Sequence, residues 1–182
     1  MIARMRHILS RFRVDRRGVS AVEFALLAPL MITLYVGCAE ISDGVSADRK
    51  VTLTAAALAN LAAQVTTISS TDMTNILDAS SAIISPYSTS QLTITLSCVN
   101  IDANKNATVK WSVTRGGTAR SGTITIPSAL AVASSQLLLG EASYQYRPTI
   151  GYTVTGTLNL SDKMYMSPRI TAPVYNSTAC AS

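Results

Sequence analysis

The fold of this chain is decided by residues 16–29, which read RRGVSAVEFALLAP. Two arginines lead to Gly18, small residues follow, and one carboxylate, Glu23, stands at the head of an apolar run that lasts to Ala39. Charged side chains inside a bilayer are rare and usually functional, because hydrocarbon solvates a charge poorly. Glu23 is therefore the residue of this sequence that most needs an explanation.

The apolar run predicts a transmembrane helix that includes Glu23. Phe24–Ala39 would form a helix of roughly 24 Å, which is short of the ~30 Å hydrocarbon core of a bilayer. A helix that starts at Val19 instead reaches roughly 31 Å. The span thus places Glu23 about one turn from its cytoplasmic end, where the carboxylate needs a proton, water or a cation.

The positive charge of the sequence lies before this span. Six arginines and one aspartate precede Val19 and account for the whole net charge of +5, and the nine basic and nine acidic residues that follow cancel. A basic segment before an apolar helix favours a cytoplasmic N-terminus by the positive-inside rule. It also argues against a nucleic-acid partner, since phosphate binding needs a lasting basic surface.

This arrangement resembles the N-terminus of the TadE-like minor pilins, or pseudopilins, of tight-adherence (Tad/Flp) pili. In that family a prepilin peptidase cuts after a glycine, and a glutamate stands fifth in the mature chain, followed by an aromatic residue. Here Gly18 matches the glycine, Val19 the new first residue, Glu23 the glutamate and Phe24 the aromatic residue. The Ala28–Pro29 step also suits the family.

The resemblance implies a protein of the bacterial inner membrane with a cytoplasmic N-terminus and an extracytoplasmic head, needed for pilus assembly and cell adhesion. Its implied partners are the prepilin peptidase, other minor pilins, the major Flp-type pilin, the inner-membrane assembly platform and membrane lipid. Cleavage would free the α-amino group of Val19, which titrates near ~8. We expect this cation to pair with Glu23 of a neighbouring subunit and to set the register of the assembly.

Three alternatives stay open at this stage. Ser20 and Glu23 fit an S-x-x-E capping box, in which Glu23 would only satisfy backbone N–H groups. The sequence before Cys38 loosely resembles a lipoprotein cleavage box, although Tyr35 stands where that box prefers leucine. The chain could also be a membrane-anchored extracytoplasmic binding module that never enters a fibre.

The apolar helix carries two further features. Pro29 lacks the N–H that would bond to the carbonyl of Ala25, which predicts a kink. Ala21, Ala25 and Ala28 fall on one face, where small side chains permit close helix packing. Alanines that simply face lipid are the alternative.

Beyond the span the pattern predicts an α+β, pilin-like head: an amphipathic helix that continues the membrane helix and packs on a small antiparallel sheet of four or five strands. Helical spacing covers about Val45–Ile68, and Thr71-Asp72 could cap a short third helix that ends before Pro86. From Gln91 the period becomes two, with strands expected near residues 92–98, 107–114, 123–126, 137–147, 152–160 and 163–166. The expected organisation is a leader (1–18), an assembly helix (19–39), a helical region (40–90) and a β-rich head (91–182).

The cysteines suggest a disulfide in the head. An extracytoplasmic compartment is oxidising, so Cys98 and Cys180 form the natural pair and would tie the C-terminal tail to the sheet. The alternative is a core thiol at Cys98 and a free thiol at Cys180.

No residue can be nominated for catalysis, metal binding or cofactor binding. The sole histidine, His7, lies in the leader, so no Ser–His or Cys–His pair could form after cleavage. A zinc site would need histidines or a C-x-x-C motif. The acidic residues of the head are expected on the solvated surface: Asp72, Asp78, Asp102, Glu141 and Asp162. The sequence thus predicts a protein that is neither an enzyme nor dependent on a cofactor.

Overall fold

A computed structural model describes residues 17–148 and 156–180 of the chain. The leader as far as Arg16 and the first residues of the strand expected over 152–160 lie outside this range. Two compact units divide the chain between Ser42 and Asp43. The second unit, from Asp43 onward, is called the head below.

The described part of the first unit belongs to helix α2 (Arg17–Ala63), which continues into the head. One helix, spanning Gly18–Ala63, is long and apolar enough to cross a membrane. Gly44 lies inside α2 and does not interrupt it. The helix ends at Ala63, five residues earlier than the apolar spacing predicted.

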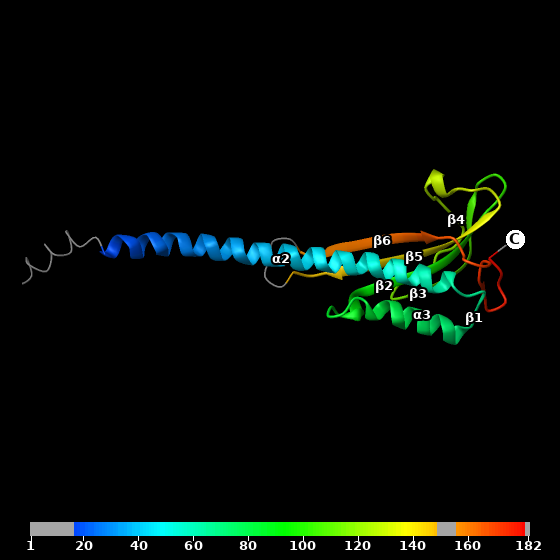
Figure 1. Cartoon of the computed structure of the whole chain (residues 1–182), viewed down its shortest axis with the longest axis horizontal. Coiled ribbons are helices and arrows are strands. Elements are labelled where there is room, and N and C mark those ends of the chain that lie inside the picture. Colours follow the sequence, from blue (N-terminus) through cyan, green and yellow to red (C-terminus); the bar gives the residue numbers. More distant parts are fainter. Residues whose placement is uncertain (1–16, 149–155, 181–182) are drawn as a thin grey trace, which may run out of the picture. The chain divides into compact units, whose positions relative to one another are not determined.

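The head is built on an antiparallel sheet of five strands in the order β4-β3-β2-β5-β6 (Figure 1). The central pairs are long and in register, with Leu96 opposite both Val113 and Gly140. One irregularity interrupts the β2–β3 register at Cys98 and Val99. The strands are β2 (Leu92–Ile101), β3 (Ala107–Arg115), β4 (Thr123–Ile124), β5 (Ser135–Tyr146) and β6 (Leu158–Met166).

The main core lies between α2 and one face of this sheet. The buried helix positions are small or aliphatic, and they meet the alternate residues of β2 and β5 that begin with Leu92 and Leu138. At Gly140 the two layers come so close that a Cβ there would lie 3.1 Å from the Cβ of Ala59. The helix contributes Ala47, Val51, Ala55, Leu58, Ala62 and Ala63 to this core.

The opposite face of the sheet is divided in two. A second, smaller apolar cluster is formed by β2, β3 and β5 beneath the connection that contains β4 and the 3-10 turn Ser128–Leu130. Elsewhere this face carries threonine and serine pairs such as Thr95–Thr114 and Ser97–Ser112, each with hydroxyl oxygens 2.8 Å apart. Thr95 and Ser97 are buried, so these pairs satisfy hydroxyl groups that are shielded from solvent.

Helix α3 (Ser70–Ala82) follows the first long helix and starts with a capping box. Ser69 is the N-cap, and its hydroxyl accepts the amide of Asp72 while the Asp72 carboxylate accepts the amide of Ser69. The cap was predicted at Thr71-Asp72, and the structure places it two residues earlier, at Ser69. Hydrogen bonds from the Ser69 hydroxyl and amide hold the pKa of Asp72 below its usual range.

The C-terminal tail is attached to the head at three points. Strand β7 (Val174–Tyr175) pairs in parallel with β1 (Thr67–Ile68), which replaces the helical end expected at Ile68. The indole N–H of Trp111 donates to the carbonyl of Pro173 at 3.2 Å. Cys98 and Cys180, both buried, form a disulfide with Cα atoms 5.8 Å apart.

The predicted fold class is confirmed: a long apolar N-terminal helix is followed by a small antiparallel sheet in an α+β arrangement. The separate strands expected before and after residue 161 are one strand, β6, because its residues pair without a break with β5 from Leu158 to Met166. The 3-10 turn Thr89–Gln91 leads directly into β2.

Candidate membrane and assembly helix

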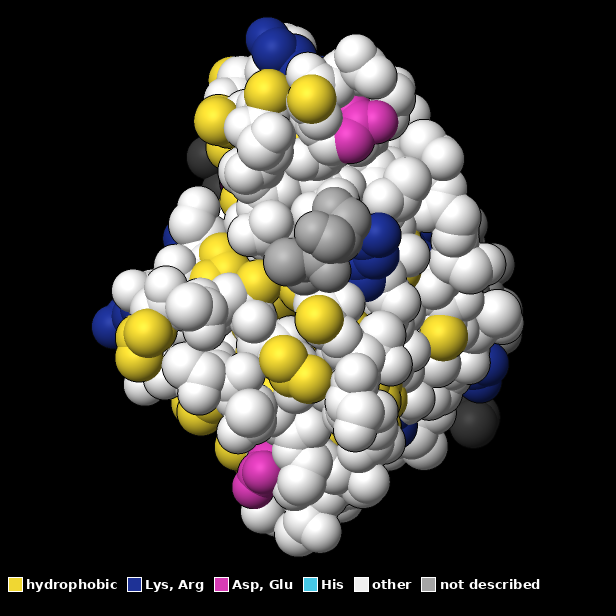
Figure 2. Space-filling view, turned by 90° about the vertical axis from the view of Figure 1, so that its right-hand side faces the viewer, with side chains coloured by type: hydrophobic (Ala, Val, Ile, Leu, Met, Phe, Trp, Pro, Cys, Tyr) yellow, Lys and Arg dark blue, Asp and Glu magenta, His cyan; other side chains and the backbone are white. Residues whose placement is uncertain are grey.

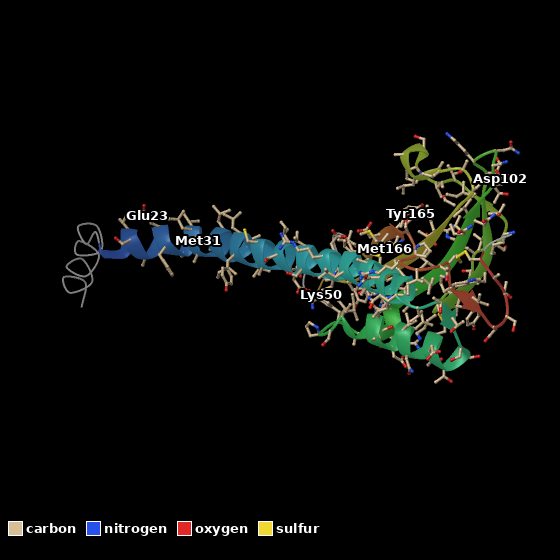
Figure 3. All side chains as sticks on the ribbon, turned by 45° about the vertical axis from the view of Figure 1, so that its right-hand side comes forward. Glu23, Met31, Lys50, Asp102, Tyr165 and Met166 are labelled. Carbon is tan, nitrogen blue, oxygen red and sulfur yellow. A yellow bond between two sulfur atoms is a disulfide. The ribbon has the colours of Figure 1, made fainter. Side chains whose placement is uncertain are left out.

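The N-terminal part of α2 presents its apolar side chains to the surroundings. Exposed fractions run from 49% at Leu27 to 78% at Tyr35, although both residues are ordinarily core formers. An exposed apolar surface of this extent marks a membrane or protein interaction site. Figure 3 shows the side chains of Glu23 and Met31 standing out from this part of the helix.

Glu23 lies within the regular helix. The helix already includes Arg17, so Ser20 is an interior position and cannot be the N-cap that a capping box requires. In the uncleaved chain, therefore, Glu23 does not belong to a capping box. Val19 stands four residues before Glu23, so both side chains lie on the same face of the helix.

Gly18 has no packing role within the described chain. A Cβ built at this position meets nothing within 4 Å, and the same is true of Gly37. Neither glycine has a positive φ. The fold therefore does not require glycine at position 18.

Pro29 lies inside α2, and the helix continues on both sides of it. The hydroxyl of Thr33 donates to the Pro29 carbonyl at 2.8 Å, a contact to the preceding turn that often accompanies helix bending. The kink itself stays a prediction. Phe24, Ala21 and Ala25 are exposed, so they too are available to a neighbour.

Cys38 is an exposed free cysteine, whereas the other two cysteines are joined. It lies inside the helix, close to the end of the first unit.

The head holds its own end of α2 through a carboxylate and two tyrosines. The hydroxyls of Tyr87 and Tyr146 donate to the two oxygens of Asp43 at 2.7 and 2.8 Å. Farther along the helix, the ammonium of Lys50 donates to the carbonyls of Ile83 and Ser85. Burial raises the pKa of Tyr87, and the hydrogen bond and charge of Asp43 raise it further. Burial likewise raises the pKa of Tyr144.

Several acidic residues of the head have partners, although Asp78 lies on the solvated surface as expected, with 62% of its side chain exposed. Asp162 accepts the hydroxyl of Thr52 at 2.6 Å, and Asp78 forms an ion pair with Arg115 at 2.6 Å. Glu141 is bound by Arg120 and Lys163. These partners are far apart in the sequence, so periodicity alone gave no signal of them.

Charged side chains are spread over the surface seen in Figure 2, where lysines, arginines and acids stand among mostly uncharged side chains.

Asp102 stabilises the turn after β2. Its carboxylate accepts the amide of Asn106 at 2.8 Å, and this hydrogen bond lowers the pKa of Asp102.

The comparisons with known proteins concern the long helix. Residues 18–60 match the family model described as TadE-like protein. No curated protein and no solved structure matched the chain. The long helix of this protein is therefore similar to the TadE-like family, as the residues around Gly18 and Glu23 predicted. Its length and apolar character fit a single-pass membrane anchor.

Proposed function

We propose that this protein is a minor pilin of a tight-adherence pilus, cut by a prepilin peptidase between Gly18 and Val19 and assembled through its apolar helix. The observation that carries the proposal is the TadE-like match, which begins at Gly18 and covers a helix whose apolar side chains are exposed. The protein is a substrate of the peptidase rather than an enzyme.

The open surroundings of Gly18 support the cleavage. Since a side chain at this position would meet nothing in the described part of the chain, packing there does not explain the glycine. Recognition by a peptidase that needs close access to the backbone does explain it, because glycine lets another molecule approach the main chain.

Glu23 supports the assembly step. In hydrocarbon an isolated carboxylate is strongly disfavoured, so a cation at the same depth stabilises it. Cleavage creates such a cation at Val19, only one helical turn away along the axis. Within one subunit this amine lies on the preceding turn. In a neighbouring subunit displaced by about one turn, it lies level with Glu23.

The proposed partners are the prepilin peptidase, other minor pilins, the major pilin, the assembly platform and the lipid of the inner membrane. The head would lie outside the cytoplasm. The disulfide between Cys98 and Cys180 supports that location, because structural disulfides persist in oxidising compartments.

The test is the mass of the mature protein and of its N-terminal peptide, from cells with and without the prepilin peptidase. The proposal requires a chain that starts at Val19 only when the peptidase is present. A chain that keeps Met1 in both strains would leave a simple membrane anchor, and a lipidated start at Cys38 would make the protein a lipoprotein.

A matched pair of substitutions separates recognition from folding. Gly18→Leu should block cleavage, whereas Gly37→Leu should not, although both side chains enter open space. Equal processing of the two variants would contradict the assignment of the cleavage site. Recovery of the wild-type protein with sheared pili, rather than only with membranes, tests incorporation into the fibre.

A further inference from the structure

The connection after β3 begins with residues 116–122, a short segment that carries no large apolar side chain. Both of its ends are fixed to the sheet. The hydroxyl of Thr93 donates to the carbonyl of Gly116 at 3.0 Å, and the amide of Val109 donates to the carbonyl of Gly122 at 2.9 Å. We call residues 117–121, which lie between these two points, the strap.

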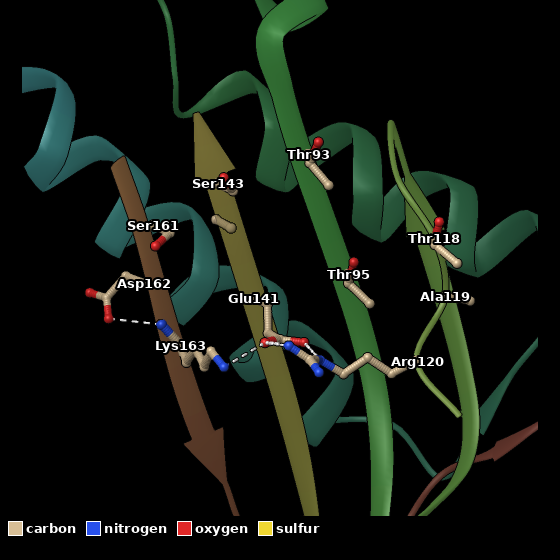
Figure 4. A pocket seen from close by; sticks show the side chains of 11 residues that line it. Thr93, Thr95, Thr118, Ala119, Arg120, Glu141, Ser143, Ser161, Asp162 and Lys163 are labelled. Carbon is tan, nitrogen blue, oxygen red and sulfur yellow. Dashed lines mark hydrogen bonds and ion pairs between the residues drawn. The ribbon is translucent and has the colours of Figure 1, made fainter. Parts of the chain in front are cut away.

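Arg120 attaches the strap to the outer face of the sheet. Its amide donates to the hydroxyl of Ser112 on β3 at 3.1 Å. Its side chain crosses β2, and Nε and Nη2 donate to the two carboxylate oxygens of Glu141 on β5 (Figure 4). Glu141 is well shielded, with 13% of its side chain exposed. Among the residues that the structure describes, no other hydrogen bond joins the strap to the sheet.

The surface beside the strap is polar. Thr95 and Ser97 of β2 are buried there, and their hydroxyls pair with those of Thr114 and Ser112. The apolar cluster on the same face is covered by later residues of the connection, which lie outside the strap. A strap that lifts would therefore bring hydroxyls into water without exposing the apolar core. Segments with few buried apolar contacts open at low free energy.

Lys163 of β6 offers Glu141 a second cation. Its ammonium lies 3.4 Å from Oε1 of Glu141, the same oxygen that accepts Nη2 of Arg120 at 2.7 Å. Lys163 does not belong to the strap, so it stays beside Glu141 when Arg120 leaves. A shielded carboxylate without any cation is strongly disfavoured, and Lys163 removes that obstacle to opening.

We propose that the strap is a salt-sensitive latch with two positions. In the closed position Arg120 binds Glu141, and the strap forms one wall of a hollow of about 500 Å³. In the open position the Arg120 guanidinium is in solvent, Lys163 alone neutralises Glu141, and the buried hydroxyls of β2 become accessible. Gly116 and Gly122 mark the ends of the moving part, and their φ values of 80° and 75° favour glycine. The latch does not depend on the processing or assembly proposed above.

Trypsin provides a direct test, because it cuts after an arginine only when the guanidinium enters its specificity pocket. Cleavage between Arg120 and Ser121 therefore requires the open position. The full-length protein in detergent micelles would be digested briefly, and the cut identified by mass spectrometry. The two fragments stay joined by the disulfide between Cys98 and Cys180 and separate only on reduction. A chromogenic arginine peptide in the same solution corrects for the activity of trypsin.

The rate of this cut should depend on salt and on both partners of the exchange. Wild-type protein should be cut faster as salt is raised, because salt screens the ion pair. Glu141→Gln should be cut about tenfold faster than wild type and respond little to salt, since it loses a charge-assisted pair. Lys163→Gln should be cut several-fold more slowly, since it removes the cation that competes for Oε1. Lys105→Gln, in the distant turn after β2, should be cut after Arg120 at the wild-type rate.

Alkylation provides a second measure that needs no protease. In a Cys38→Ala background, Thr95→Cys places a thiol among the buried hydroxyls of β2, and Thr54→Cys places one in the core beneath the helix. Iodoacetamide should label Thr95→Cys faster as salt is raised, whereas the labelling of Thr54→Cys should not respond. Circular dichroism would verify that each variant is folded.

The proposal is overturned if Lys163→Gln is cut as fast as Lys105→Gln or faster, because Lys163 would then not compete with Arg120. It is also overturned if Glu141→Gln is cut no faster than wild type, or if neither the cleavage nor the alkylation of Thr95→Cys responds to salt. Processing at Gly18 should be normal in every variant, so failure of the latch would leave the proposed function standing.

Discussion

Gly140 of strand β5 lies directly against Ala59 of α2, where helix and sheet are closely packed. A methyl group on Gly140 would stand 3.1 Å from both the Cβ and the backbone nitrogen of Ala59, and it would also meet the carbonyl oxygen of Ala55. Two of these neighbours are backbone atoms, so the contact cannot be relieved by turning a side chain.

Gly140→Ala should therefore destabilise the head. Overpacking in a well-filled core typically costs about 1–3 kcal/mol, and we expect a loss in that range from urea unfolding of the protein in micelles. Gln145→Ala on the same strand is the control, because Gln145 is exposed. Equal stability of the two variants would mean that the helix can move away from the sheet.

Because Tyr87 donates a hydrogen bond to Asp43, we expect the head to lose stability at alkaline pH. The folded-state pKa of Tyr87 is raised, chiefly by burial and then by Asp43, so the folded protein holds this proton more tightly than the unfolded chain. The resulting stabilisation is complete below the unfolded value of about 10 and disappears as the pH rises through the folded pKa. Tm should thus fall as the pH is raised beyond 10.

Tyr87→Phe tests the origin of this loss. The variant should be less stable by about 1–2 kcal/mol at neutral pH, because it loses a hydrogen bond to a charged group. Its stability should also decline less steeply in alkali. Tyr175→Phe leaves the Asp43 cluster intact and should follow the wild-type curve. A Tyr87→Phe curve parallel to wild type would assign the alkaline loss to other groups.

Removal of the disulfide should weaken the head far more than removal of the free cysteine. Cys98 and Cys180 are 82 residues apart, and a closed loop of this size is worth about 4.5 kcal/mol in the chain-entropy model. Cys98→Ala combined with Cys180→Ala should lower the free energy of unfolding by about this amount, and Cys38→Ala should not change it. Thiol alkylation without reduction should label Cys38 alone; labelling of all three cysteines would disprove the pairing in the native protein.

Replacement of Glu23 should separate insertion from assembly. Glu23→Gln removes the charge but keeps the shape, so the protein should insert and be cut at Val19 yet reach sheared pili in much smaller amounts. Glu23→Gln leaves the Val19 amine without its partner charge in a low-dielectric site, which should weaken the association of subunits at least several-fold. The deficit should therefore be obvious on an immunoblot of the pilus fraction. Asp48→Asn, an exposed acid in the head part of α2, is the control. Wild-type amounts of Glu23→Gln in the fibre would refute the role of the carboxylate.

The sequence predicted those parts of the fold that local patterns encode. The period-two pattern from Leu92 and the pattern after Asn106 give β2 and β3, and Ala142, Tyr144 and Tyr146 were correctly placed on one buried face. The apolar run also predicted a long apolar helix, and the residues around Gly18 and Glu23 carried its resemblance to TadE-like proteins. These features depend on neighbours in the sequence, so they can be recognised without a structure.

The rest depends on contacts between distant residues. Ile68 leaves the helix because it pairs beside Tyr175, a partner more than a hundred residues away that no local pattern reveals. Glu141 is a largely shielded carboxylate because Arg120 and Lys163 reach it from two other segments. The role of Gly140 likewise required the crossing of α2 over β5. Tertiary packing, rather than propensity, sets each of these features.

The disulfide can form only late in export, after the segment that carries Cys180 has crossed the membrane. If the chain crosses the membrane behind its helix, Cys38 and Cys98 leave the cytoplasm before Cys180, and Cys98 must wait as a thiol until a further 82 residues have followed. During that interval Cys38 is the competing partner. Secretion of the last segment is then the event that closes the head, so a subunit whose tail has not crossed can be distinguished chemically from a finished one.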